Sequence, residues 1–163
     1  MTKSNHPGRT GEDKCKKSRP GNQNWKVLLD FRLPARLEEI EKLAEAVNKV
    51  LTDRDLAFSA TLCLEELITN TIVYGLKRAS DRFIHVRLSV SDEWLEILLK
   101  DDAPRFDPFS QVPRPDLELD ISERPIGGLG VHLVKTLMDE VHAYYDGTGN
   151  LFVLYKALPP RAS

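Results

Sequence analysis

The chain has few cysteines, few aromatic residues and no long apolar run. Two cysteines in 163 residues are too few for a disulfide framework and lack the spacing of a metal site. We therefore predict that Cys15 and Cys63 are free thiols. No segment approaches the roughly 20 apolar residues that cross a bilayer, and the basic start lacks the apolar stretch of a secretory signal. These absences predict a soluble, cytoplasmic protein with no membrane partner.

Net charge is also small, at −2, but it is unevenly distributed along the chain. Residues 1–24 carry six Lys or Arg and two Asp or Glu, whereas the remaining residues carry seventeen and twenty-three. Because the first segment is polar and has no apolar periodicity, we predict a disordered basic tail over 1–24. The acidic body lacks the basic face of a DNA-binding domain, so we expect no direct nucleic-acid partner.

The first half of the chain predicts one strand followed by two helices. Apolar residues alternate over 25–34, which is typical of a strand, and a proline ends it. Helical spacing over 35–51 indicates an amphipathic helix. A second helix is predicted over 52–76, with a capping candidate and acidic residues at its start and Gly75 at its end.

The second half predicts two hairpins with a loop and a helix between them. Strands are expected at 83–90 and 94–100 around a short turn, and a final hairpin at 139–158. A helix is expected over 129–139. Since the strands follow one another in hairpins without repeated strand-helix-strand units, we predict an α+β, two-layer sandwich. Its mixed sheet would be mostly antiparallel and would carry the helices on one face.

Residues 101–125 contain five of the chain's ten prolines and little apolar periodicity. A loop this long inside a compact domain is commonly a lid or a binding loop, although a plain linker is the alternative. We therefore favour a functional loop.

Three glycines, Gly127, Gly128 and Gly130, precede an amphipathic helix. Glycine lets the backbone approach a ligand closely, and the free N–H groups of a first helical turn suit an anion such as phosphate. The same glycines could instead serve only a sharp turn and tight packing. By themselves they leave both interpretations open.

Glu66 and Asn70 lie four residues apart in the second predicted helix and so project from one face. An asparagine oxygen can bind Mg²⁺, and a nearby glutamate can accept a proton from an attacking hydroxyl. A solvated helix face would show the same spacing. Asp101, at the end of a predicted buried strand, can accept a hydrogen bond from an exocyclic amine of adenine, or can simply be an acidic strand end.

Four motifs in this order resemble those of the GHKL, or Bergerat-fold, ATP-binding superfamily. Within it, the chain is similar to small anti-sigma-factor serine/threonine kinases of the RsbW/SpoIIAB type. The pattern E-x-x-x-N-x-x-x-[HY]-G is matched at 66–75, and D-x-G-x-x-F-D-P is matched with one change at 101–108. The glycine box is matched at 127–134 and the closing strand pattern G-N-x-[LF]-x-L-x-K at 149–156. The resemblance covers about residues 26–158.

The resemblance implies a site that binds ATP and Mg²⁺. Glu66 would be the catalytic base, Asn70 the Mg²⁺ ligand and Asp101 the residue that reads adenine. The segment 107–126 would be the ATP lid within an ATPase domain at 25–158, followed by a frayed end at 159–163. The remaining cofactor-binding residues implied by the resemblance are Ala103, Arg105, Phe106, Gly127, Gly128, Leu129, Gly130 and Val131.

Two residues depart from the family pattern near Asp101. Ala103 stands where the family has glycine, and its methyl group could crowd the adenine. Arg105 stands where the wider superfamily often has glycine. A cation there could face the phosphates, but a solvated arginine is the simpler interpretation. Both changes predict at most a modest loss of ATP affinity.

The family resemblance implies an anti-sigma factor that also phosphorylates a STAS-domain antagonist, so that its partners switch. A sigma factor or another regulated protein would be the second partner, and family members often form homodimers. The alternative is a nucleotide-gated binding protein that regulates another target with little or no kinase activity. Intact Glu66 and Asn70 favour the kinase.

Overall fold

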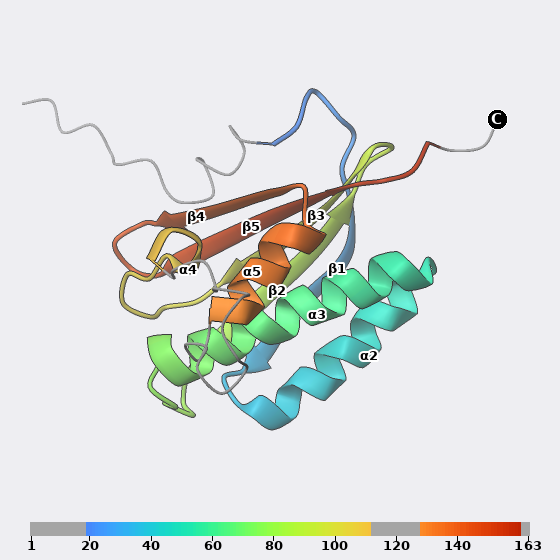
Figure 1. Cartoon of the computed structure of the whole chain (residues 1–163). Coiled ribbons are helices and arrows are strands. Elements are labelled where there is room, and N and C mark those ends of the chain that lie inside the picture. The colour runs from blue at the N-terminus through green and yellow to red at the C-terminus, as the bar shows by residue number, and fades with distance from the viewer. Residues whose placement is uncertain (1–18, 112–127, 161–163) are drawn as a thin grey trace, which may run out of the picture.

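The computed structural model describes residues 19–111 and 128–160 and shows two layers (Figure 1). The strands form one sheet in the order β1-β2-β3-β5-β4, and all neighbours in this described sheet are antiparallel. The strands are β1 (Lys26–Pro34), β2 (Phe83–Val90), β3 (Trp94–Lys100), β4 (Glu140–Tyr145) and β5 (Asn150–Ala157). The predicted α+β sandwich is confirmed.

Helices α2, α3 and α5 cover one face of the sheet (Figure 1). They are α2 (Ile40–Val50), preceded by a 3-10 turn at Leu37–Glu39, α3 (Arg54–Asn70), continued by a π turn at Thr71–Gly75, and α5 (Gly128–Leu137). A short helix, α4 (Pro108–Gln111), lies within the predicted lid. The residues from 112 to 127, most of that lid, lie outside the described part of the chain.

Local signals account for the element boundaries. The Asp53 side chain accepts a hydrogen bond from the Leu56 N–H at 2.8 Å and so caps α3. In the β2–β3 turn, the Ser91 hydroxyl accepts a hydrogen bond from the Trp94 N–H at 3.0 Å. The Asp146 carboxylate similarly accepts bonds from the Thr148 and Gly149 N–H groups in the β4–β5 turn, at 2.8 and 3.0 Å.

The main core lies between the helices and the sheet. Along β2, Ile84, Val86 and Leu88 are fully buried toward the helices, and the alternate residues face outward, as a period of two requires. Cys63 of α3 is buried in this core, and desolvation raises the pKa of its thiol to about 12. Cys63 is therefore a structural residue.

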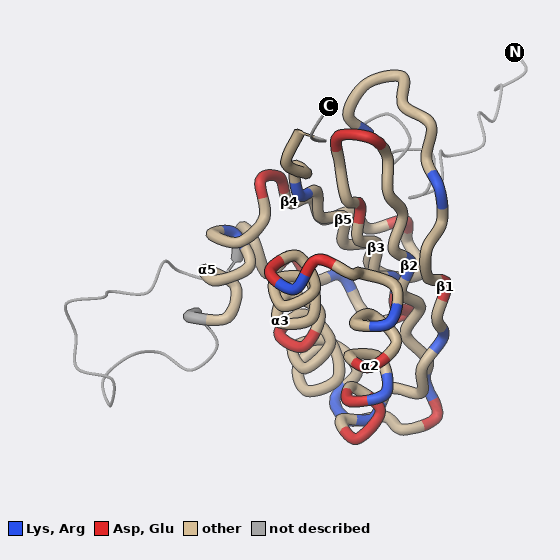
Figure 2. Tube along the Cα trace, turned by 90° about the vertical axis from the view of Figure 1, so that its right-hand side faces the viewer, with Lys and Arg blue, Asp and Glu red and all other residues tan. Residues whose placement is uncertain are grey.

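The segment Arg54–Gly75 is long and apolar enough to cross a membrane by length and composition, with a mean hydropathy of 1.3. Half of its most apolar window is buried inside the fold. Helix α3 packs between α2, α5 and the sheet, so it has the surroundings of a core helix (Figures 1 and 2). Figure 2 also shows acidic and basic positions interleaved along α2 and β1.

The outer face of the sheet carries a second apolar cluster. Its buried members come from β3 and β5, and aromatic side chains from the strand ends and the segment before β1 pack against them. The cluster consists of Leu98, Leu151, Val153 and Tyr155, with Trp25, Trp94 and Tyr144 around it. This face is therefore only partly open to solvent.

Arg19 attaches the segment before β1 to this outer face. Its Nε donates to Glu96 Oε2 at 2.7 Å, and its guanidinium lies 5.0 Å from the centre of the Trp25 ring. Glu96 is fully buried, and the Tyr155 hydroxyl donates to it at 3.1 Å. The described part of the predicted tail, 19–24, therefore contacts the sheet, whereas 1–18 lies outside the described residues.

Replacing Arg19 with alanine should destabilise the domain, because it leaves the buried Glu96 carboxylate without its cation. We expect the free energy of unfolding to fall by roughly 2–3 kcal/mol, below the usual range for a fully buried pair because Arg19 is partly exposed. Urea unfolding measures this change. Lys42→Ala removes an exposed pair with Glu39 and should cost less than about 0.5 kcal/mol. Equal effects of the two substitutions would show that the Arg19 contact is only a surface pair.

Candidate functional site

Glu66 and Asn70 lie on one face of the last two turns of α3. Asn70 is 9% exposed and Glu66 is half-buried. Neither side chain makes a hydrogen bond or ion pair with another described residue. Two polar groups that are largely enclosed by protein yet unpaired are available to a ligand.

Helix α5 begins against Glu66. A Cβ atom added to Gly130 would lie 1.9 Å from Glu66 Oε2 and 2.6 Å from its Cδ. Only glycine allows this approach without a shift of the carboxylate. The first-turn N–H groups of α5, which have no acceptor within the helix, therefore lie beside the predicted catalytic carboxylate.

A π turn follows Asn70 and contacts Asp101, the residue predicted to read adenine. The Leu76 N–H bonds to the Thr71 carbonyl at 2.7 Å, which is the i to i−5 pattern of a π turn. Such turns are rare and often occur at functional sites. Here the Thr71 hydroxyl donates to Asp101 Oδ2 at 3.4 Å and so joins α3 to the end of β3.

Asp101 follows β3 and is 5% exposed. Its Oδ1 accepts three hydrogen bonds: 2.9 Å from the Ala103 N–H, 2.9 Å from Asn150 Nδ2 and 3.3 Å from the Asn150 N–H. Oδ2 has only the long bond from Thr71. Desolvation raises the pKa of Asp101, and the hydrogen bonds from Asn150, Ala103 and Thr71 oppose that rise. Oδ2 is thus the oxygen with capacity to accept an N–H from a ligand.

The residues after Asp101 differ in their exposure. Ala103 is 2% exposed, and a Cβ on Gly75 would be 3.2 Å from its methyl group. The extra methyl of Ala103 is therefore packed against the glycine that ends the π turn. Arg105 is exposed, as the simpler interpretation of it predicted. Phe106 is half-buried, and its N–H donates to the side chain of Asn150 at 2.8 Å.

The glycine box is only partly described. Gly127 lies outside the described residues, and α5 begins at Gly128. Val131 is 3% exposed and packs inward, so only its backbone N–H can serve a ligand. Of Leu129 only the backbone is described. Gly130 provides the contact with Glu66.

Asn150, the first residue of β5, is a site residue to which sequence reasoning gave no role. It is 1% exposed and bonds to Asp101, to the Pro104 carbonyl at 3.0 Å and to the Phe106 N–H. The signal in the sequence was the closing motif at 149–156, whose second position is Asn150 but which by itself gives that residue no role. Its partners could not be inferred, because they lie more than 40 residues earlier in the chain.

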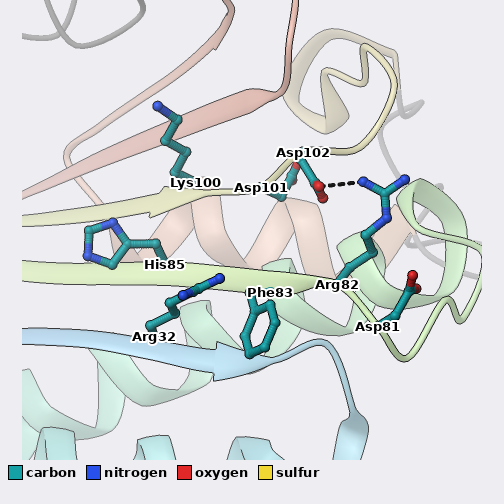
Figure 3. A pocket seen from close by; sticks show the side chains of 8 residues that line it. All are labelled: Arg32, Asp81, Arg82, Phe83, His85, Lys100, Asp101 and Asp102. Atoms are coloured by element: carbon teal, nitrogen blue, oxygen red, sulfur yellow. Dashed lines mark hydrogen bonds and ion pairs between the residues drawn. The ribbon is translucent and has the colours of Figure 1, made fainter.

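A pocket of about 250 Å³ opens near Asp101 but on the other side of the sheet (Figure 3). Figure 3 shows Arg82 paired with Asp102 at its rim, while Arg32 lies close to the Phe83 ring. Glu66 and Asn70 do not line this pocket. The contact between Gly130 and Glu66 is instead on the helix side of the sheet, between α5 and α3.

These groups fit ATP and Mg²⁺ chemically. The first turn of α5 offers N–H donors, and Gly130 lets that turn lie against the Glu66 carboxylate. Asn70 offers an amide oxygen that no other described residue bonds, which is a ligand type that Mg²⁺ accepts. Asp101 offers Oδ2, whose single bond, from Thr71, is long.

Comparison with known proteins gives one family and several relatives. The family described as "Histidine kinase-like ATPase domain" matches residues 32–156. The chain is 27% identical over 125 residues to "Serine-protein kinase RsbW" of Listeria monocytogenes serovar 1/2a, covering 72% of this chain and 80% of that one. It is 23% identical over 132 residues to the protein of the same name from Staphylococcus aureus strain MRSA252, covering 76% and 83%.

The contact between Gly130 and Glu66 predicts a coupled effect on stability. Gly130→Ala requires the Glu66 carboxylate, the end of a flexible side chain, to move, while alanine is the better helix former, so the free energy of unfolding should change by less than about 1 kcal/mol. In a Glu66→Ala background no carboxylate has to move, so the same substitution should raise the free energy of unfolding by up to about 1 kcal/mol. Urea unfolding of all four proteins measures the coupling. Additive effects would show that Gly130 and Glu66 do not touch.

The raised pKa of Asp101 predicts a pH-dependent stability. The folded protein holds this proton more tightly than the unfolded chain, whose pKa is near the ordinary value of 3.8. The stabilisation is therefore complete below 3.8 and is lost as pH rises through the folded pKa. We expect the unfolding free energy of wild type relative to Asp101→Asn to fall over that window in urea titrations. A difference that grows with pH would show that the pKa is lowered instead.

Proposed function

The chain belongs to the histidine kinase-like ATPase domain family, and from this premise we propose that it is an ATP-dependent protein serine/threonine kinase. Its substrate would be a STAS-domain antagonist, and its regulated partner a sigma factor that it binds and silences. The names of the relatives support the kinase. The observation that carries the proposal is the position of Glu66, an unpaired carboxylate at the start of α5 and one helical turn from the unpaired amide of Asn70.

Each residue has a chemical task in this proposal. The N–H groups at the start of α5 bind phosphate oxygens, and Asp101 Oδ2 accepts a hydrogen bond from the adenine amine. Asn70 holds Mg²⁺ through its side-chain oxygen. The bound ion supplies positive charge that offsets the charge of the β- and γ-phosphates.

Glu66 is the proposed general base. Its carboxylate accepts the proton of the serine or threonine hydroxyl as that oxygen bonds to the γ-phosphorus, while the bond from that phosphorus to the β–γ bridging oxygen breaks and ADP leaves. Gly130 lets the backbone of α5 approach Oε2, so the carboxylate lies beside the N–H groups proposed to bind phosphate. Ala103 packs against Gly75 rather than standing free in the site, which supports retained adenine binding.

Calorimetric titration with ATP, with and without Mg²⁺, tests the binding half of the proposal. Wild type should bind in a magnesium-dependent manner, and Asn70→Ala should weaken binding roughly tenfold or more because a ligand to the ion is lost. Asn48→Ala, which changes an exposed asparagine on α2, is the matched control and should bind like wild type. Absence of binding at millimolar ATP would contradict the proposal.

The catalytic half of the proposal concerns Glu66. Glu66→Gln should bind ATP normally but transfer phosphate about 10²- to 10⁴-fold more slowly to a purified STAS-domain protein, because the amide cannot accept the hydroxyl proton. Single-turnover transfer from γ-labelled ATP measures the rate. ATP binding without any transfer, in wild type as well as in the variant, would favour the nucleotide-gated binding protein.

A further inference from the structure

We infer that Asn150 is a positioning residue that joins adenine recognition at Asp101 to the backbone of the segment that leads from β3 into α4. The inference rests on the proposed function, because it assumes that Asp101 reads a base. It concerns a different residue, however, and makes its own predictions.

The carboxamide of Asn150 has only one orientation that satisfies its neighbours. Its Nδ2 faces Asp101 Oδ1 at 2.9 Å and the Pro104 carbonyl at 3.0 Å, and both groups are acceptors. Its Oδ1 faces the Phe106 N–H at 2.8 Å, which is a donor. An aspartate would place acceptor against acceptor on the first side, so the position requires an amide.

Asn150 thereby decides which oxygen of Asp101 is free. With the Ala103 N–H, its side chain and backbone direct three donors to Oδ1. Oδ2 is left with one long bond from Thr71. Rotation of the carboxylate would break short bonds, so the free acceptor is held in one place for an exocyclic amine.

The same amide holds the segment between Asp101 and α4. Pro104 and Phe106 lie between β3 and α4, and both bond to Asn150 through their backbones. Farther along, Phe109 of α4 packs edge-to-face on Phe152 of β5, with ring centres 6.1 Å apart. The Asn150 side chain that orients Asp101 thus also holds the backbone of the segment that leads into α4.

This arrangement predicts that binding of a base amine to Asp101 stabilises the hydrogen bond of the Phe106 N–H. A base that bonds to Oδ2 fixes Asp101, which fixes the Asn150 amide and hence the acceptor of the Phe106 N–H. A nucleotide without the amine lacks this connection even when its phosphates bind at α5. Coupling of this kind links base identity to the hydrogen bond of the Phe106 N–H.

The test compares ATP with purine riboside triphosphate, which has no exocyclic amine, on wild type, Asn150→Asp and the control Asn48→Asp. In calorimetry, wild type and the control should prefer ATP by about tenfold or more, and Asn150→Asp by less than about threefold. Asn48 is an exposed asparagine bonded to the Ala44 carbonyl, so the control makes the same chemical change away from the site. An unchanged ATP preference in Asn150→Asp would overturn the inference.

Hydrogen exchange in wild type tests the coupling even if Asn150→Asp does not fold. ATP should slow exchange of the Phe106 amide at least about threefold more than purine riboside triphosphate does, with both nucleotides at saturation. Equal protection by the two would overturn the inference. Failure of the proposed function has a different signature, since wild type would then bind neither nucleotide, and both proposals would fall.

Discussion

The candidate site depends on the burial of one carboxylate. Asp101 is nearly excluded from water at the end of the sheet's central strand, where an unpaired charge would be strongly unfavourable. Its oxygens are satisfied by a strand start, a loop N–H and the hydroxyl of a π turn. Three segments far apart in sequence must therefore meet at this point. The role proposed for Asp101 in reading a ligand depends on this meeting.

Close packing at glycine supports the second half of the site. The backbone of Gly149 lies against Asp101, where an added Cβ would be 1.8 Å from its carbonyl oxygen, so β5 reaches the end of β3. Gly130 similarly brings α5 onto Glu66. The two contacts set the positions of the proposed base-reading and phosphate-binding ends of the site relative to α3. A side chain at either glycine would displace a functional group.

The two faces of the sheet differ in the residues that cover them. The helix side carries Glu66, Asn70 and the start of α5, while the outer side is closed in part by Arg19 and an aromatic cluster. Glu96 is buried in that cluster, and an ion pair buried so deeply stabilises a fold mainly by avoiding an unpaired charge. The segment before β1 is therefore part of the domain from Arg19 onward.

The sequence by itself determined the elements whose signals are local. The hairpin strands Phe83–Val90 and Trp94–Lys100 lie where the period of two and the short turn predicted them, and the capped helix ends where Gly75 predicted. The family motifs correctly indicated the fold and the ATPase family. Tertiary structure alone decided two buried pairs. The partner of Asn150 is Asp101, 49 residues earlier in the chain, and the partner of Glu96 is Arg19, 77 residues earlier. The periodicity of the sequence cannot predict such pairs, because the two side chains meet only when distant segments pack together.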